Sequence, residues 1–303
     1  MYKYKVYGLT IESEVEIMQL QKASEEARAD VCIRQADCKD EVEKFLKEND
    51  ATARRYEIGL EYSCFENKGG YYVIREGKEI SFECRNDYTP DMVTPWLTGF
   101  ALAMLLLQRK ILAIHCSAIS CGDGAFLVAG NPGAGKTSNT RKLIERGFKF
   151  MADDVAAVKL ENEGAFVFPA FPYQKLCRNE VESRNLDLKE LIYINEDKDK
   201  FLVPAKEHFA DEPQKLKFMI YLMVGDVPEV TVNKLTGISQ LIGFKNNLFL
   251  HKLPGDWEKS REVGELCLKC AGLCPVYMIV RPREGDSQEK IADIIQGIID
   301  QVN

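Results

Sequence analysis

The sequence predicts an α/β protein, with a small N-terminal α+β part followed by a larger part in which strands and helices alternate. From Lys110 onward, apolar stretches of strand length alternate with amphipathic stretches of helix length. Within that alternation, the glycine-rich sequence GNPGAGKT (residues 130–137) stands between a predicted strand and a predicted helix. The chain of 303 residues is long enough for one large domain or two modest ones.

Short strands separated by linkers make up the first part of the chain. Their residues alternate between apolar and polar types or are rich in Tyr, Val and Ile, and the spacing of the later ones is typical of hairpins. The predicted strands are residues 2–11, 29–34, 56–63, 71–76 and 79–84, with one helix at 41–49. We therefore expect an N-terminal α+β domain at residues 1–88, with a role in substrate recognition, and an ATP-binding catalytic domain at residues 89–303.

A helix over residues 86–110 is predicted to join the two parts. Asp87 or Thr89 can cap it, Pro90 suits its first turn, and Pro95 restarts or kinks it. Its most apolar run, residues 99–107, is much shorter than the ~20 residues of a membrane span, which favours a buried helix. The N-terminus has no apolar core typical of a signal peptide, so we expect a cytoplasmic protein without a membrane partner.

The second part follows a regular strand and helix alternation. Its predicted strands are residues 111–120, 125–130, 148–152, 155–160, 165–168, 218–224 and 276–281, and its predicted helices are 137–146, 237–244, 259–272 and 286–300. The charged stretch 195–217 is expected to be mostly loop, either a lid over an active site or a solvated face.

Charge and cysteine usage exclude some classes of function. The net charge of −7 argues against nucleic acid as a partner, because a negative protein gains nothing from the phosphate backbone. Cys267, Cys270 and Cys274 have a spacing that a metal or iron–sulfur site could use. No fourth ligand stands nearby in the sequence, so we interpret them as small apolar residues on a helix.

The sequence at 130–137 is a complete Walker A pattern. Its glycines allow backbone N–H groups to turn toward phosphate oxygens, and the helix that follows points its positive end at the same oxygens. Lys136 can reach the β- and γ-phosphates, and the Thr137 hydroxyl can bind Mg²⁺. The predicted nucleotide-binding residues are Gly130, Asn131, Pro132, Gly133, Ala134, Gly135, Lys136, Thr137 and Ser138.

Two adjacent carboxylates, Asp153 and Asp154, follow the strand after the P-loop helix. Successive side chains of an extended chain point to opposite sides, so one carboxylate can hold Mg²⁺ while the other accepts a proton from a substrate hydroxyl. A solvated turn at the strand end is the alternative interpretation. His115 lies in the preceding predicted hairpin, beside the phosphate site, and is either catalytic or a core histidine.

A second cation is expected at the γ-phosphate. The candidates are Lys200, Lys206, Arg281 and Arg283. Arg281 stands first among them because it lies at the end of a predicted strand.

These residues together resemble the HPr kinase/phosphorylase family, whose nucleotide domain is similar to that of phosphoenolpyruvate carboxykinases. The resemblance covers His115, the hairpin, the Walker A loop, the helix that ends in Arg-Gly, and the sequence ADD at residues 152–154. It implies a P-loop domain of that type, ATP and Mg²⁺ as cofactors, and catalytic roles for His115, Lys136, Asp153 and Asp154, with Mg²⁺ held by Thr137 and Asp153.

Downstream, ESRNLD (residues 182–187) is similar to the E-x-R-G-L-G signature of the family, and this likeness implies that Glu182 is a further metal ligand. Asn185 and Asp187 stand where the signature has glycines. The resemblance therefore implies the kinase activity and leaves the phosphorylase activity open.

A second resemblance concerns the substrate. The sequences at 4–17 and 171–182 look like those of the HPr-kinase-like proteins that act in lasso-peptide maturation. This likeness implies a kinase that phosphorylates a serine-type hydroxyl of a ribosomally made precursor peptide. A kinase of a small metabolite such as free serine, an HPr-type protein serine kinase and a non-enzymatic nucleotide-binding regulator are the alternatives. Assembly into a homo-oligomer stays open.

Overall fold

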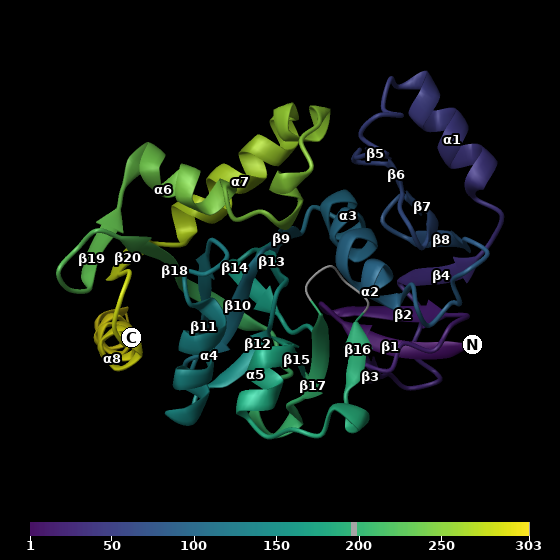
Figure 1. Cartoon of the computed structure of the whole chain (residues 1–303). Helices are drawn as coiled ribbons and strands as arrows, with labels where there is room; N and C mark the ends of the chain where they lie inside the picture. The colour runs from purple at the N-terminus through teal and green to yellow at the C-terminus, as the bar shows by residue number, and fades with distance from the viewer. Residues whose placement is uncertain (195–198, 303) are drawn as a thin grey trace. The chain divides into compact units, whose positions relative to one another are not determined.

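The computed structural model describes residues 1–194 and 199–302, and the packing divides the chain into two compact units (Figure 1). The first unit comprises Met1–Ala113, Lys175–Val203 and Lys252–Gly264, and the second comprises Ile114–Gln174, Pro204–His251 and Glu265–Asn303. Each unit is therefore assembled from three separate segments of the chain. A functional division between residues 88 and 89 stays a prediction.

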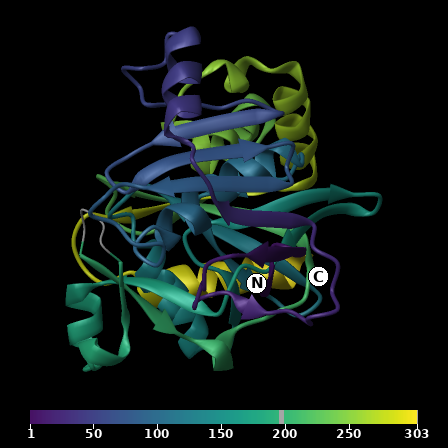
Figure 2. The same ribbon diagram turned by 90° about the vertical axis from the view of Figure 1, so that its right-hand side faces the viewer.

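A mixed sheet forms the body of the first unit, and Figure 2 shows its strands side by side. Its order is β3-β1-β2-β4-β8-β7-β6-β5, with parallel pairing of β2 with β4 and of β4 with β8. The strands are β1 (Tyr2–Val6), β2 (Leu9–Ser13), β3 (Gln21–Lys22), β4 (Val31–Gln35), β5 (Tyr56–Glu57), β6 (Tyr62–Glu66), β7 (Gly70–Arg75) and β8 (Glu79–Cys84). Strands occur in all five of the segments predicted from the sequence.

Side chains on both faces of β7 are buried, and successive residues point to opposite faces of the sheet. Tyr71 and Val73 pack with Val42 and Leu46 of α1 (Lys39–Glu48), on the first face. On the other face, the ring of Tyr72 stacks on Phe65 at a centroid distance of 4.3 Å. This buried strand, apolar on both sides, is the centre of the first unit.

The helix predicted over residues 86–110 is shorter than expected. It begins with α2 (Thr94–Trp96), continues as the π-helical η1 (Leu97–Ala101), and ends as α3 (Leu102–Gln108). Pro95 explains the late start, because a helix that extended back past it would bring its ring against the carbonyl of Asp91. That carbonyl instead accepts a hydrogen bond of 2.8 Å from the Thr94 hydroxyl. Within the described residues, no helix combines the length and the apolar character that a membrane crossing requires.

A small sheet of order β15-β17-β16 follows later in the chain. Its elements are β15 (Tyr173–Cys177), α5 (Arg178–Ser183), η2 (Leu188–Glu190), β16 (Ile192–Ile194), β17 (Lys200–Pro204) and η3 (Lys206–His208). The expectation that residues 195–217 are mostly loop is therefore wrong for residues 200–204 and 206–208, where buried Phe201 and Val203 pack β17 against α5, and for residues 214–217, which begin the next strand. Residues 195–198 lie outside the described part of the chain.

The second unit is built on a sheet of order β12-β10-β11-β18-β14-β13-β9, and β20 also pairs with β18 and β19. Its strands are β9 (Leu112–Ile114), β10 (Cys116–Ser120), β11 (Gly124–Gly130), β12 (Lys149–Ala152), β13 (Ala156–Glu161), β14 (Gly164–Phe168), β18 (Gln214–Gly225), β19 (Thr231–Leu235) and β20 (Val276–Pro282). Strand β18 runs parallel to β11 on one side and to β20 on the other. The predicted strand at 111–120 is interrupted at His115.

Helices cover this sheet. α4 (Lys136–Glu145) and α8 (Gln288–Val302) pack on one face, where Leu143, Ile291 and Ile295 join a cluster with Phe126 and Phe218. The remaining helical elements are α6 (Gly237–Lys245), η4 (Phe249–Lys252), η5 (Asp256–Lys259) and α7 (Arg261–Leu273). The predicted fold class is confirmed, because the chain is a mixed α/β protein in which a P-loop joins β11 to α4. Its N-terminal residues form a mixed sheet with one packed helix, α1.

The helix predicted around the three clustered cysteines is confirmed. Cys267 and Cys270 lie in α7, Cys274 follows its last turn, and all three are buried. Burial raises the pKa of the Cys267 thiol to about 11 and that of the Cys270 thiol to about 12, and it raises the pKa of Cys274 as well. Thiols in this state are protonated near neutral pH and behave as small apolar side chains.

We expect these three cysteines to resist alkylation in the folded protein. Iodoacetamide at pH 8 should leave Cys267, Cys270 and Cys274 unmodified, because the thiolate is the reactive form and the sites are buried. Peptide mapping by mass spectrometry measures this, with the half-buried Cys32 and Cys177 as internal references. Modification of the helical cysteines as fast as that of the references would contradict the assignment, and so would stoichiometric zinc or iron in the purified protein.

Candidate active site

The loop between β11 and α4 has the backbone of a phosphate cradle. Gly130 and Gly135 adopt φ values of +153° and +101°, which L-residues with a side chain rarely reach. A Cβ atom on Gly130 would lie 2.5 Å from the carbonyl oxygen of Leu222 in β18. The glycine thus allows the loop to leave the sheet in contact with the neighbouring strand. Asn131, Pro132 and Gly133 at the crown of the loop are exposed.

Lys136 is the first residue of α4, and its side chain folds back along the loop. Its Nζ donates a hydrogen bond of 2.6 Å to the carbonyl oxygen of Gly130. The ammonium group therefore lies on the inner side of the loop, at the positive end of a ten-residue helix. Thr137 and Ser138 follow in the first turn of α4, and both are half-buried.

The two carboxylates follow the end of β12, and each has its own partner. The Ser117 hydroxyl donates to Asp153 Oδ1 over 3.1 Å. His115 Nδ1 lies 3.5 Å from Asp154 Oδ1, with both side chains about a quarter exposed. Asp154 has a φ of +78°, so the chain turns sharply at this residue. The two aspartates are therefore held by different groups and in different backbone conformations.

Strand pairing brings the carboxylates toward the loop. Strand β10 lies between β11 and β12, with Cys116 opposite Ala129 and Ala118 opposite Ala152. The residues that precede Gly130 and Asp153 therefore flank the same end of β10.

The pKa of the Cys116 thiol also indicates that the P-loop lysine and the two aspartates lie close together. Burial raises the pKa of this thiol. Among the nearby charges, Lys136 lowers it, while Asp153 and Asp154 raise it further. One buried side chain is thus within electrostatic range of three of the four predicted catalytic groups, Lys136, Asp153 and Asp154.

His115 occupies the break between β9 and β10. Its backbone N–H donates to the carbonyl oxygen of Asn247 over 2.7 Å, and its ring lies 6.0 Å from that of Phe249. The histidine is fixed by its backbone, while its ring is directed to Asp154. Ser117 was not predicted from the sequence, although its position two residues after His115 on an extended chain places it on the same side.

The candidates for a second cation have different surroundings. Arg281, at the end of β20, donates to the carbonyl oxygens of Ala134 and Gly133 in the loop, each over 3.0 Å. Arg283 pairs with Asp226 over 2.7 Å. Lys200 lies in β17 of the first unit and Lys206 in η3 of the second. A contact of any of the four with a γ-phosphate stays a prediction.

Glu182 belongs to α5 of the first unit, so its predicted role as a metal ligand stays a prediction. The residues around it do explain one departure from the family signature. Asn185 has a φ of +52°, the left-handed conformation that glycine favours and asparagine tolerates. Asparagine at this position therefore adopts a conformation that glycine also adopts readily.

The residues of the second unit fit a nucleotide with Mg²⁺. The glycine conformations leave an exposed loop crown, and a lysine lies at a helix N-terminus, which together suit a polyphosphate. The Thr137 hydroxyl and the Asp153 carboxylate are oxygen donors of the kind that Mg²⁺ prefers. Within residues 1–194 and 199–302, no three His, Cys, Asp or Glu side chains form a group that could hold a metal without further ligands.

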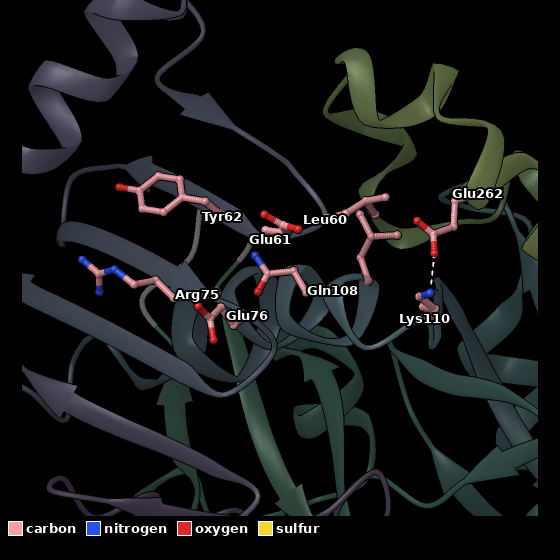
Figure 3. Close-up of a pocket in the computed structure, with 9 residues that line it drawn as sticks. Leu60, Glu61, Tyr62, Arg75, Glu76, Gln108, Lys110 and Glu262 are labelled. Atoms are coloured by element: carbon pink, nitrogen blue, oxygen red, sulfur yellow. Dashed lines mark ion pairs between the residues drawn. The ribbon is translucent and has the colours of Figure 1, made fainter.

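The first unit contains a pocket of about 630 Å³ (Figure 3). It is lined by Leu60, Glu61, Tyr62, Arg75, Glu76, Leu107, Gln108, Lys110 and Glu262. Lys110 pairs with Glu262 across one side, and Arg75 pairs with Glu79 over 3.1 Å. Sequence reasoning missed this pocket because its lining comes from four distant segments that carry no shared motif.

Comparisons with known proteins find HPr kinase/phosphorylases. The chain is 26% identical over 173 residues to an HPr kinase/phosphorylase from Mycoplasmopsis pulmonis (strain UAB CTIP), a match that covers 51% of the chain and 54% of that relative. The chain thus spans about half the length of the curated relative. The resemblance to HPr kinase/phosphorylases is confirmed by this match. No family model matches the chain.

Among solved structures, an Hpr(Ser) kinase/phosphatase from Coxiella burnetii is similar at a TM-score of 0.33 and 12% identity. That match covers 61% of this chain and 94% of the other chain.

The left-handed conformation of Asp154 predicts an unusual response to substitution. Asp154→Gly should be more stable than Asp154→Ala by about 1 kcal/mol, because only glycine adopts this conformation without a steric cost. Asp153 has a negative φ, so Asp153→Gly should be less stable than Asp153→Ala. Urea unfolding of the four variants measures both differences. An Asp154→Gly variant no more stable than Asp154→Ala would show that the backbone of Asp154 is not strained.

Proposed function

We propose that the chain is a kinase that transfers the γ-phosphoryl group of ATP to a serine-type hydroxyl of a peptide. One observation carries this proposal: a Walker A loop and a pair of aspartates flank the same end of β10. A phosphate cradle alone would also suit a nucleotide-binding regulator. Two carboxylates with separate partners beside it provide for both metal binding and proton transfer, which a regulator does not need.

In this proposal the loop binds the triphosphate. Backbone N–H groups of the loop, among them that of Gly135, and the ammonium of Lys136 hold the phosphate oxygens, and the N-terminus of α4 adds its partial positive charge. Thr137 and Asp153 bind Mg²⁺, with Glu182 as a further candidate ligand. When bound, Mg²⁺ neutralises charge on the phosphates. The hydrogen bond from Ser117 fixes the orientation of the Asp153 carboxylate.

Asp154 is the proposed base. The substrate hydroxyl oxygen forms a bond to the γ-phosphorus, the bond from that phosphorus to the bridging oxygen of ADP breaks, and the hydroxyl proton passes to Asp154. His115, 3.5 Å from this carboxylate, orients it and shares the proton. Because phosphoryl transfer has a loose transition state, positioning and charge neutralisation contribute more than the base.

A peptide is the proposed substrate because of the first unit. This unit carries a large sheet with two short edge strands, β3 and β5, where an extended peptide could pair. The sequence likeness to lasso-peptide kinases favours a precursor peptide that ends in serine. Free serine, an HPr-type protein and ATP binding without catalysis are the alternatives. A cytoplasmic location, the absence of nucleic acid and membrane partners, and assembly into a homo-oligomer stay predictions.

We expect Asp153→Asn and Asp154→Asn each to lower phosphotransfer by at least 100-fold, the scale of a positioned acid or base. ATP binding should survive in at least one of them, because the loop still holds the phosphates. Calorimetry with ATP and a radiolabel transfer assay measure the two effects. Asp123→Asn, in the turn at the far end of the β10–β11 hairpin, is the matched control. Near wild-type turnover in either site variant would remove that residue from the catalytic group.

Substrate choice is tested on a panel of three hydroxyl compounds with ATP. A serine-ended precursor peptide should gain the mass of one phosphoryl group faster than an HPr-type protein or free serine, because the first unit binds its remainder. Mass spectrometry follows all three reactions. Faster turnover of free serine would favour a metabolite kinase, and faster turnover of the protein an HPr-type kinase. Tight ATP binding with no transfer to any of them would favour a regulator.

A further inference from the structure

Three backbone carbonyls hold the guanidinium of Arg281. Its Nε donates to Ala134, its Nη2 to Gly133 and its Nη1 to Pro282, each over 3.0 Å. The first two acceptors are consecutive residues of the P-loop, nearly 150 positions earlier in the chain. A planar group with donors in a fixed fork suits two adjacent acceptors of this kind.

The sheet explains how the arginine reaches the loop. In the registers of β18, Gly130 lies beside Leu222 on one side and Arg281 lies beside Val224 on the other. The side chain of Arg281 therefore crosses the end of β18 to reach the loop that leaves β11. Gly135 lies next to this contact, since a Cβ atom there would lie 3.5 Å from Arg281 Nε, an ordinary van der Waals distance.

These contacts fix the direction of the loop amides. A peptide group is planar and trans, so its N–H points away from its own carbonyl oxygen. With the oxygen of Gly133 held, the N–H of Ala134 closes a turn on the carbonyl of Asn131 over 3.0 Å. With the oxygen of Ala134 held, the N–H of Gly135 points to the side opposite the guanidinium.

We propose that Arg281 is a positioning residue of the phosphate site, which holds the crown of the P-loop in the conformation that receives a polyphosphate. The inference rests on the proposed binding of ATP. The three carbonyl acceptors carry no net charge, so the positive charge of Arg281 remains beside the loop. It adds to that of Lys136 in attracting the phosphates.

Three full-length variants test the proposal: Arg281→Met, Arg281→Lys and the control Lys217→Met. Lys217 pairs with exposed Asp123 near the other end of β18, so its replacement removes one positive charge from the same sheet without touching the loop. Calorimetry measures the affinity for MgATP and for inorganic tripolyphosphate. Thermal unfolding is followed with and without each ligand, and kinetics give the KM for ATP and kcat separately.

Arg281→Met should weaken both ligands about tenfold or more and reduce the rise in melting temperature that each ligand gives. Arg281→Lys should recover part of the affinity, because it restores the charge without the fork. Lys217→Met should bind within about twofold of wild type. The KM for ATP should rise more than kcat falls.

Wild-type affinity in Arg281→Met for both ligands would overturn the proposal while leaving ATP binding intact. If Arg281→Met does not fold, wild-type affinity in Arg281→Lys would overturn it equally. A wild-type chain that binds neither MgATP nor tripolyphosphate would overturn both this proposal and the proposed function.

Discussion

Strand β18 is the constraint on which the second unit depends. Its twelve residues pair with β11 and β14 and, toward its end, with β20, so it joins the segment that carries the P-loop to the segment that carries Arg281. Phe218 and Ile220, fully buried, anchor it beneath α4 and α8. The P-loop thus contacts β18 through the strand that precedes it, and it contacts Arg281 of β20 through two of its carbonyl oxygens.

The candidate site combines backbone conformations that are costly with contacts that maintain them. Gly130 and Gly135 adopt positive φ values at no steric cost, because glycine has no side chain. Asp154 also has a positive φ, but its side chain makes this conformation costly. Its carboxylate near His115 and the neighbouring contact of Ser117 with Asp153 hold that turn. The polar groups here therefore serve the backbone conformation as well as the proposed chemistry, so a substitution at the site is expected to change both stability and activity.

The sequence predicted those parts of the fold that depend on local patterns. The hairpin before the P-loop, α4 and the cysteine-bearing α7 follow from periodicity and turn residues within a few positions. The helix begins at Thr94 and not near residue 86 as predicted from the capping residues Asp87 and Thr89. The clash of the Pro95 ring with the carbonyl of residue 91 prevents the earlier start. Sequence patterns could not predict the division into units of three segments each, the pocket, or the contacts of Arg281, because these depend on packing between residues far apart in the chain. The acceptors of Arg281 are backbone carbonyls, which every residue has, so no residue type indicates them.

The distance in sequence between the P-loop and Arg281 has a consequence for synthesis of the chain. During translation the glycine loop leaves the ribosome long before β18 and β20 exist. At the usual rates of elongation, the interval between residues 136 and 281 lasts roughly 7 to 30 s. For that time the nascent chain carries the complete Walker A sequence without the strand that supports it or the arginine that orients it. The supported conformation of the loop therefore forms only after the last strand has been synthesised.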